Sequence, residues 1–449
     1  MPDRQPSPLD RFLRLFTDVR GGEGGTALLL TLNVFLLLTA YYILKPVREA
    51  LILVGGGAEI KAYAAAGQGP LLLAAVPMYA RLASLLPRRR LINTVTLFFT
   101  GCLALFYVLA QFDVPLGVVF YLWVGIFNLM IIAQFWSFAN DIYSQDEGKR
   151  LFPIVAFGAS SGAVAGGALA WRLADTLGNY QLMLLAGVLL LASLALTGLV
   201  DTSRRRAPAT DDAVTPQQTD EPLGDEKAFR LVLRSRYLLL IALLIMLLNW
   251  VNTTGEYILG KVVKQAAVTA VSLSASGLTE GQYITEFYGG FFTVVNILGV
   301  VVQLFLVSRV IKYAGIRWAL LVLPAIALVG YALLAFVPIL AVVRWAKTAE
   351  NATDYSLQNT VRQALFLPTT REEKYKAKQA IDTFFVRAGD VLSAALVFAG
   401  VNWLAFETQH FALVNLVLVG LWIALALAIG RGYDRLAASR GHNDASPSS

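Results

Sequence analysis

Cysteine and histidine are nearly absent from this chain of 449 residues, which has one cysteine, Cys102, and two histidines, His410 and His442. A single cysteine excludes an internal disulfide framework, and no cysteine and histidine residues have the spacing of a metal site. Two histidines are also too few for histidine-based acid–base chemistry. The sequence therefore predicts no metal site and no cofactor.

Charged residues are scarce as well. They make up 15% of the chain, whereas hydrophobic residues make up 57%, and the mean hydropathy is +0.62. A soluble globular protein has about 25% charged residues. This composition indicates an integral membrane protein that crosses the bilayer several times.

Motifs of soluble enzymes are missing or misplaced. The sequence has no G-x-x-x-x-G-K-[ST] phosphate loop, which argues against a pump that hydrolyses its own ATP. The segment GASSG (158–162) matches a nucleophile pattern, but it lies in an apolar run with no strand before it. We therefore expect a protein that is not an enzyme and that has no nucleic-acid partner.

Long apolar runs predict twelve transmembrane helices. They fall near residues 26–46, 62–82, 91–111, 115–139, 151–172, 180–200, 237–260, 283–307, 317–337, 339–366, 377–400 and 411–431. Basic residues gather in alternate loops, for example at Arg88–Arg90 and at Arg204–Arg206. By the positive-inside rule, both termini and the central loop lie in the cytoplasm.

The two halves of the chain repeat weakly. YYILKPVREA (41–50) resembles EYILGKVVKQ (256–265), and similar pairs keep an offset between about 215 and 229 residues. Six plus six parallel repeats predict an all-α, major-facilitator-like fold of 12 transmembrane helices in two six-helix bundles. The expected parts are an N-terminal segment (1–25), a first bundle (26–200), a linker with a basic amphipathic helix (201–236), a second bundle (237–431) and a tail (432–449).

Glycine recurs every four residues in the fifth predicted helix, at Gly158, Gly162 and Gly166. Small residues at this spacing let another helix backbone come close. We expect this face to be a packing surface.

A polar stripe runs along the tenth predicted helix, within VVRWAKTAENATDYSLQNTVRQALFLP (342–368). Its members step by three or four residues and so share one helical face: Arg344, Lys347, Asn351, Asp354, Gln358 and Arg362. The stripe rises about 27 Å, nearly the thickness of the hydrocarbon layer. An amphipathic surface helix is the simpler interpretation, but the neighbouring spans favour a helix that lines a transport pathway.

Other ionisable and polar residues fall within the predicted spans. As substrate-binding candidates we select Lys45, Arg48, Asn128, Glu256, Lys261, Arg344, Lys347, Asn351, Asp354, Gln358, Arg387 and Asp390. The basic residues would bind phosphate or carboxylate oxygens, and Glu256, Asp354 and Asp390 would pair with them when no anion is bound. Arg387 and Asp390, three residues apart on one helical face, can instead pair simply with each other.

Three stretches resemble the ATP/ADP translocase family, which belongs to the major facilitator superfamily. They are ILKPVREALILVGGGAEI (43–60), FWSFANDIYSQDEGKRLFPIVAFGA (135–159) and DYSLQNTVRQALFLPTTREEKYKAKQAIDTFFVRAGD (354–390). The resemblance implies exchange of ATP for ADP or uptake of other nucleotides. Because the sequence is similar to a divergent bacterial branch of the family, the resemblance also implies a protein of the bacterial inner membrane. The resemblance matches Lys45, Glu256 and Arg387 to charged family positions. Asn128 stands where an acidic residue is expected, and Asp390 where a lysine is expected.

The sequence as a whole predicts a multi-pass secondary transporter that works by alternating access. We expect its substrate to be a small anion, a nucleotide or a related phosphorylated metabolite, and the protein to be a monomer in the lipid bilayer. A proton-coupled carrier or exporter of another organic compound is the alternative, with Glu256, Glu286, Asp354 or Asp390 taking up the proton. A membrane sensor or scaffold that transports nothing is a third hypothesis.

Overall fold

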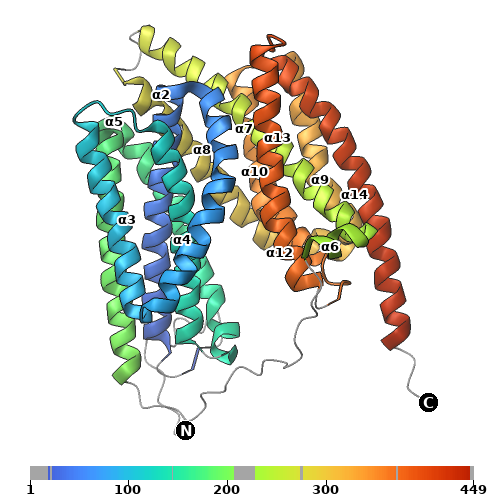
Figure 1. Cartoon of the computed structure of the whole chain (residues 1–449), viewed down its shortest axis with the longest axis horizontal. Coiled ribbons are helices and arrows are strands. Elements are labelled where there is room, and N and C mark those ends of the chain that lie inside the picture. Colours follow the sequence, from blue (N-terminus) through green and yellow to red (C-terminus); the bar gives the residue numbers. More distant parts are fainter. Residues whose placement is uncertain are drawn as a thin grey trace. The chain divides into compact units, whose positions relative to one another are not determined.

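The computed structural model describes residues 19–20, 23–143, 145–206, 228–273, 277–370 and 373–444. In these ranges the chain is almost entirely helical and contains no strand, as Figure 1 shows. The first half contains α2 (Gly24–Leu85), α3 (Arg88–Ala110), α4 (Gly117–Ile142) and α5 (Gln145–Arg206). The second half contains α6 (Ala228–Arg234), α7 (Arg236–Ser272), α8 (Glu280–Val302), η1 (Gln303–Val307), α9 (Ser308–Phe336), α10 (Leu340–Thr353), η2 (Asp354–Gln358), α11 (Asn359–Ala364), η3 (Glu373–Ala377), α12 (Lys378–Ala380), η4 (Ile381–Phe385), α13 (Val386–Asn402) and α14 (Thr408–Asp444).

Three of these helices change direction at a glycine instead of at a loop. Gly57 in α2 has φ 75°, Gly178 in α5 has φ 76° and Gly315 in α9 has φ 75°. Glycine adopts positive φ without a steric penalty because it has no Cβ. Each break therefore separates two successive helical segments. With these breaks counted, the described residues form twelve long helical segments, which confirms the predicted number of spans.

Eight helical stretches of the described chain are long and apolar enough to cross a membrane. Three of them contain one of the glycine breaks, so together they supply eleven of the twelve segments. The remaining segment comprises α10, η2 and α11 (residues 340–364), which carry the polar stripe. The stripe makes this helix too polar to pass as a span by composition alone, although it is as long as its neighbours.

Contacts between Cα atoms group the chain into two compact units. Unit 1 contains residues 1–55, 70–220 and 273–293, and unit 2 contains residues 56–69, 221–272 and 294–449. Segment 56–69 of the first half thus packs in unit 2, and segment 273–293 of the second half packs in unit 1. These segments begin at residues 56 and 273, which are 217 positions apart, within the offset of the sequence repeat. Residues 207–227 lie outside the described residues, so the boundaries of the linker stay a prediction.

Unit 1 is built around an aromatic core and a glycine column. Trp123 stacks on Phe127 with ring centroids 5.3 Å apart, and both rings are among the buried core residues. A Cβ placed at Gly162 would fall on the backbone of Phe35 in α2, and Gly158 and Gly166 meet α2 in the same way. The predicted packing role of these glycines is confirmed.

Unit 2 is arranged around α7, which packs against α10, α13 and α14, while α14 also packs along α9. The short helix α6 corresponds to the basic amphipathic helix that was predicted within the linker, residues 201–236. It contacts η3, and the rings of Phe229 and Phe384 lie 5.1 Å apart. The start of α7 is tied to the end of the polar helix, because the Tyr237 hydroxyl donates to the Leu365 carbonyl over 2.8 Å.

Candidate functional site

The polar stripe lies on one continuous helix made of α10, η2 and α11. Its middle part is a π-helical turn, Asp354–Gln358, whose wider winding changes which side chains share a face. Single π-turns of this kind occur frequently at functional sites. Within the stripe, Lys347, Asn351 and Gln358 are buried.

Lys347 is the most enclosed cation of the stripe, with 1% of its side chain exposed. Its Nζ lies 3.0 Å from Oε1 of Glu350 and donates to Oδ1 of Asn252 in α7 over 2.8 Å. It also lies 3.7 Å from Oε1 of Glu256. A charge this deeply buried must be paired and hydrogen-bonded, and Lys347 meets both conditions.

Glu256 lies between two lysines from different parts of the chain. Its Oε2 is 3.7 Å from Nζ of Lys61, whose side chain is 6% exposed, whereas Glu256 itself is 24% exposed. The amide of Asn351 donates to the other oxygen, Oε1, over 3.2 Å. Lys61, Glu256, Lys347 and Glu350 together form a lysine–glutamate cluster of balanced formal charge, and all four belong to unit 2.

The cluster is closed on the α9 side by Tyr331, whose hydroxyl lies 3.3 Å from Oε2 of Glu350. Gly255 in α7 leaves room for this arrangement, because a Cβ there would collide with the Tyr331 hydroxyl and approach Nζ of Lys347. An oxyanion that replaced the Glu256 carboxylate would find two ammonium groups already in place. Charge-assisted hydrogen bonds of this kind are the chemistry by which proteins hold phosphates and carboxylates.

A second buried carboxylate, Asp390 in α13, is satisfied by three donors. Arg387 contacts Oδ2 over 3.0 Å, while Asn249 and Thr253 of α7 donate to Oδ1 over 2.7 Å and 2.8 Å. The pairing of Arg387 with Asp390, expected from their spacing, is therefore present. Arg387 stays 35% exposed, so its guanidinium remains partly accessible.

The far end of the stripe differs from the cluster. Arg362 contacts Asp382 over 3.4 Å. The buried Oδ1 of Asp354 has no hydrogen-bond partner. The side-chain oxygen and nitrogen of Gln358 are also buried without a hydrogen-bond partner. No basic residue therefore donates a hydrogen bond to this oxygen of Asp354. Glu256 and Asp390, in contrast, contact basic residues as expected.

The other predicted residues fall into two groups. In unit 2, Nζ of Lys261 lies 3.5 Å from the Tyr257 hydroxyl, and Arg344 is half-buried on α10. In unit 1, Nζ of Lys45 lies 3.9 Å from the ring centre of Phe292. Arg48, also in unit 1, pairs with Glu49 and lies 4.6 Å from the ring centre of Tyr121. Asn128 of α4 presents a buried Oδ1 without a hydrogen-bond partner.

Sequence reasoning missed three members of the site: Lys61, Glu350 and Asn252. Lys61 stands one residue before the second span predicted near 62–82, so hydropathy does not single it out. Glu350 is three residues from Lys347, and that spacing could have identified it as a partner. Asn252 gave no signal beyond being polar within an apolar helix.

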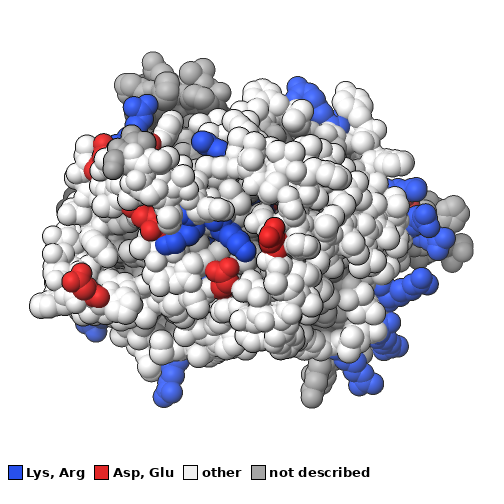
Figure 2. Space-filling model, turned by 90° about the horizontal axis from the view of Figure 1, so that it is seen from above, with Lys and Arg blue, Asp and Glu red and all other residues white. Residues whose placement is uncertain are grey.

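Figure 2 shows one face of the molecule on which most residues are uncharged, and where Lys and Arg side chains lie next to Asp and Glu side chains.

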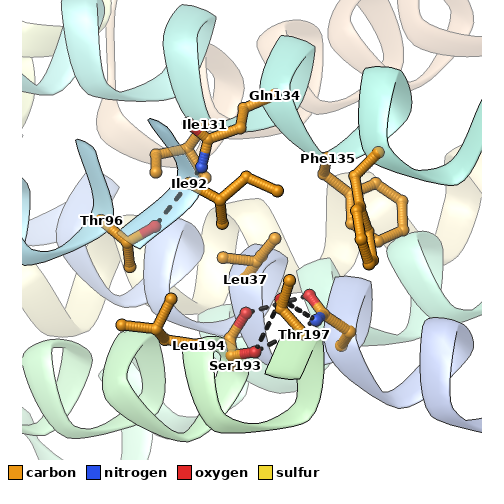
Figure 3. Close-up of a pocket in the computed structure, with 11 residues that line it drawn as sticks. Leu37, Ile92, Thr96, Ile131, Gln134, Phe135, Ser193, Leu194 and Thr197 are labelled. Atoms are coloured by element: carbon orange, nitrogen blue, oxygen red, sulfur yellow. Dashed lines mark hydrogen bonds between the residues drawn. The ribbon is translucent and has the colours of Figure 1, made fainter. Parts of the chain in front are cut away.

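A small cavity lies inside unit 1 and is shown in Figure 3. There Asn33 donates to Thr197 over 2.7 Å and Ser193 donates to Asn33 over 3.0 Å. Its lining is uncharged and contains none of the predicted site residues, so this cavity does not bear on anion binding.

The fold is that of a membrane transporter of the major facilitator type. A bacterial homologue of the human lysosomal transporter Spinster, in an inward-facing and unoccupied conformation, is similar with a TM-score of 0.61 and 13% identity, covering 92% of this chain and 98% of that chain. The nucleoside transporter NupG is similar with a TM-score of 0.60 and 14% identity, covering 90% of this chain and 98% of that chain. At these identities the likeness concerns the fold alone. It confirms the predicted all-α fold of two six-helix halves.

Sequence comparison gives the family. The family model described as TLC ATP/ADP transporter matches residues 116–433, so this chain belongs to that family. ADP,ATP carrier protein 1 of Chlamydia pneumoniae is 24% identical over 396 residues, which cover 78% of this chain and 71% of that protein. ADP,ATP carrier protein 1 of Chlamydia trachomatis serovar D is 25% identical over 347 residues, which cover 68% of this chain and 62% of that protein. Membership confirms an integral multi-pass membrane transporter that is not an enzyme.

Proposed function

We propose that this protein exchanges nucleotides, of the ATP and ADP type, across the bacterial inner membrane by alternating access. The observation that carries the proposal is the position of Glu256, whose two carboxylate oxygens each face a buried lysine. Relatives named as ADP,ATP carriers support the choice of nucleotides as the anion. We also propose that the protein acts as a monomer in the lipid bilayer and that both termini lie in the cytoplasm.

In this mechanism the Glu256 carboxylate holds the place of the substrate phosphate. A phosphate group carries more charge and more acceptor oxygens than a carboxylate, so it competes for Lys61 and Lys347. Asn252 and Glu350 keep the Lys347 ammonium in position during the replacement, because they contact it at 2.8 Å and 3.0 Å. The cluster thus offers an anion two preplaced cations and needs no rearrangement of Lys347.

The test is uptake of labelled ATP by proteoliposomes that contain the purified protein. With ADP inside, we expect uptake that does not depend on a pH gradient and that stops when internal nucleotide is left out. Lys347→Met removes a cluster cation, and uptake should fall at least tenfold. The matched control is Lys312→Met, because Lys312 is exposed on α9 and lies beside Tyr313. Absence of uptake with every internal nucleotide tried would reject nucleotide exchange.

A proton-coupled carrier of another organic anion is the second candidate. It is favoured by Asp354, a carboxylate in a membrane span with a buried oxygen that has no hydrogen-bond partner, as expected of a residue that carries protons. The same proteoliposomes distinguish the two candidates. Uptake that follows the pH gradient, needs no internal nucleotide and is lost in Asp354→Asn would establish the second.

A further inference from the structure

Segment 56–69 begins at the Gly57 break and is held in unit 2 by two adjacent polar contacts to α7. The Tyr257 hydroxyl donates to Oε1 of Glu59 over 3.0 Å, and Lys61 faces Glu256 at 3.7 Å. Adjacent residues of α7 therefore hold both charged residues of this short segment. One of them, Glu256, is also the carboxylate that pairs with Lys347.

The other exchanged segment, 273–293 in unit 1, makes contacts of a different kind, and its Phe292 ring lies 3.9 Å from Nζ of Lys45. Thr285 donates to the side chain of Asn179 over 2.7 Å. Gly289 fits closely against the backbone of Trp171, where a Cβ would collide. These contacts include no residue of the lysine–glutamate cluster. An anion that binds at the cluster therefore acts directly on segment 56–69, through Lys61.

We propose that Lys61 couples anion binding to release of segment 56–69 from α7. This inference rests on the proposed function, because the anion is taken to bind at Lys347. A phosphate at the cluster repels the Glu256 carboxylate and binds both ammonium groups. The Lys61–Glu256 contact is then lost, and of the two polar contacts to α7 described above the hydrogen bond between Glu59 and Tyr257 stays. Lys61 then acts as a positioning residue. Whether an anion occupies the cluster determines whether the segment that begins at the Gly57 break stays bound to α7.

A cysteine at position 62 reports this release. Ala62 follows Lys61 and is 3% exposed, and the chain has a single native cysteine, Cys102, which can be replaced by serine. The rate at which a maleimide labels Ala62→Cys, in a Cys102→Ser background and in purified protein, measures how often the segment leaves α7. We expect slow labelling without ligand and labelling at least threefold faster with ADP or ATP.

Lys61→Gln should raise the labelling rate at position 62 without ligand to about the rate that the parent reaches with nucleotide. Adding nucleotide to this variant should then change the labelling rate little. Lys61→Arg keeps the charge and should restore slow, nucleotide-sensitive labelling, which excludes a general folding defect. Thr285→Ala, in segment 273–293 of unit 1, is the matched control and should leave labelling at position 62 unchanged. If Lys61 only stabilised the fold, nucleotide would not change the labelling rate at position 62 in the protein that retains Lys61.

Two results would overturn the inference: labelling in Lys61→Gln equal to that of the parent, or nucleotide binding in a thermal-shift assay without faster labelling. If no nucleotide binds, the proposed function fails on its own. Phosphate and pyrophosphate then serve as probes. Faster labelling with either supports the coupling by Lys61, and unchanged labelling with both rejects it.

Discussion

Replacing Lys347 with methionine tests how strongly the buried ion pair with Glu350 stabilises unit 2. The side chains are 1% and 6% exposed, and Nζ and Oε1 are 3.0 Å apart, so water screens the pair little. Methionine approximates the length of the lysine side chain but leaves Glu350 without its closest counter-charge. Removing one partner of a buried pair costs about 3–5 kcal/mol. That loss corresponds to a decrease of roughly 100- to 4,000-fold in the ratio of folded to unfolded protein.

A double-mutant cycle measures the interaction itself. Glu350→Gln should also destabilise, because it leaves the Lys347 ammonium in excess. The double variant Lys347→Met/Glu350→Gln buries neither charge of this pair, and Glu256 keeps its contact with Lys61 at 3.7 Å. We therefore expect the double variant to be more stable than the sum of the single changes predicts, by at least about 2 kcal/mol. Independent sites add to within about 0.5 kcal/mol.

The assay is equilibrium unfolding of the purified protein in mixed micelles, with nucleotide exchange measured on the same samples. Additive costs for the two single variants would refute the buried pair as described. The double variant also separates stability from binding. It should fold but exchange nucleotide at least tenfold more slowly, because Lys347 supplies one of the two cluster cations. Exchange at the parent rate would contradict the site assignment.

Two further predictions concern unit 1. Burial acts to raise the pKa of Glu23, but hydrogen bonds from Arg150 and from the Arg20 backbone outweigh it, so this pKa lies below the ordinary value of 4.5. The contribution of the pair to stability is therefore complete above about pH 4.5 and is lost as the pH falls through the lowered pKa. The difference in melting temperature between the parent and Glu23→Gln, measured from pH 7 to pH 3, should shrink accordingly, and a constant difference would contradict the reasoning. Gly162→Leu should unfold unit 1 or lower its melting temperature by several degrees because its side chain would collide with Phe35 of α2, whereas Gly198→Leu, whose Cβ meets nothing within 4 Å, should have little effect.

Features that depend on nearby residues could be predicted from the sequence. The stripe was predicted to lie on a helix because its polar residues repeat at helical spacing, and it does. Arg387 contacts Asp390 because they are one helical turn apart. The column of Gly158, Gly162 and Gly166 packs against α2, because small residues at that spacing let a second helix backbone come close. In each case the interacting surface belongs to a single helix.

Features that depend on distant residues could not be predicted. Glu59 and Tyr257 are 198 residues apart in the chain, and the adjacent contact of Lys61 with Glu256 spans a similar separation. Hydropathy placed Lys61 just outside the second span, because a lysine lowers the average of any window that contains it. The π-turn at Asp354–Gln358 likewise has no sequence signal, and it changes the face on which Gln358 lies. Tertiary packing decides these contacts.

The charge balance of the lysine–glutamate cluster has a consequence for energetics across the membrane. Two lysines and two glutamates cancel in formal charge, so a membrane voltage exerts no net force on the cluster as a whole. At this cluster the voltage therefore acts on the bound cargo, at about 2.3 kcal/mol per elementary charge for each 100 mV. Exchange of two nucleotides of unequal charge would be electrogenic, and its direction would follow the voltage as well as the concentrations on the two sides.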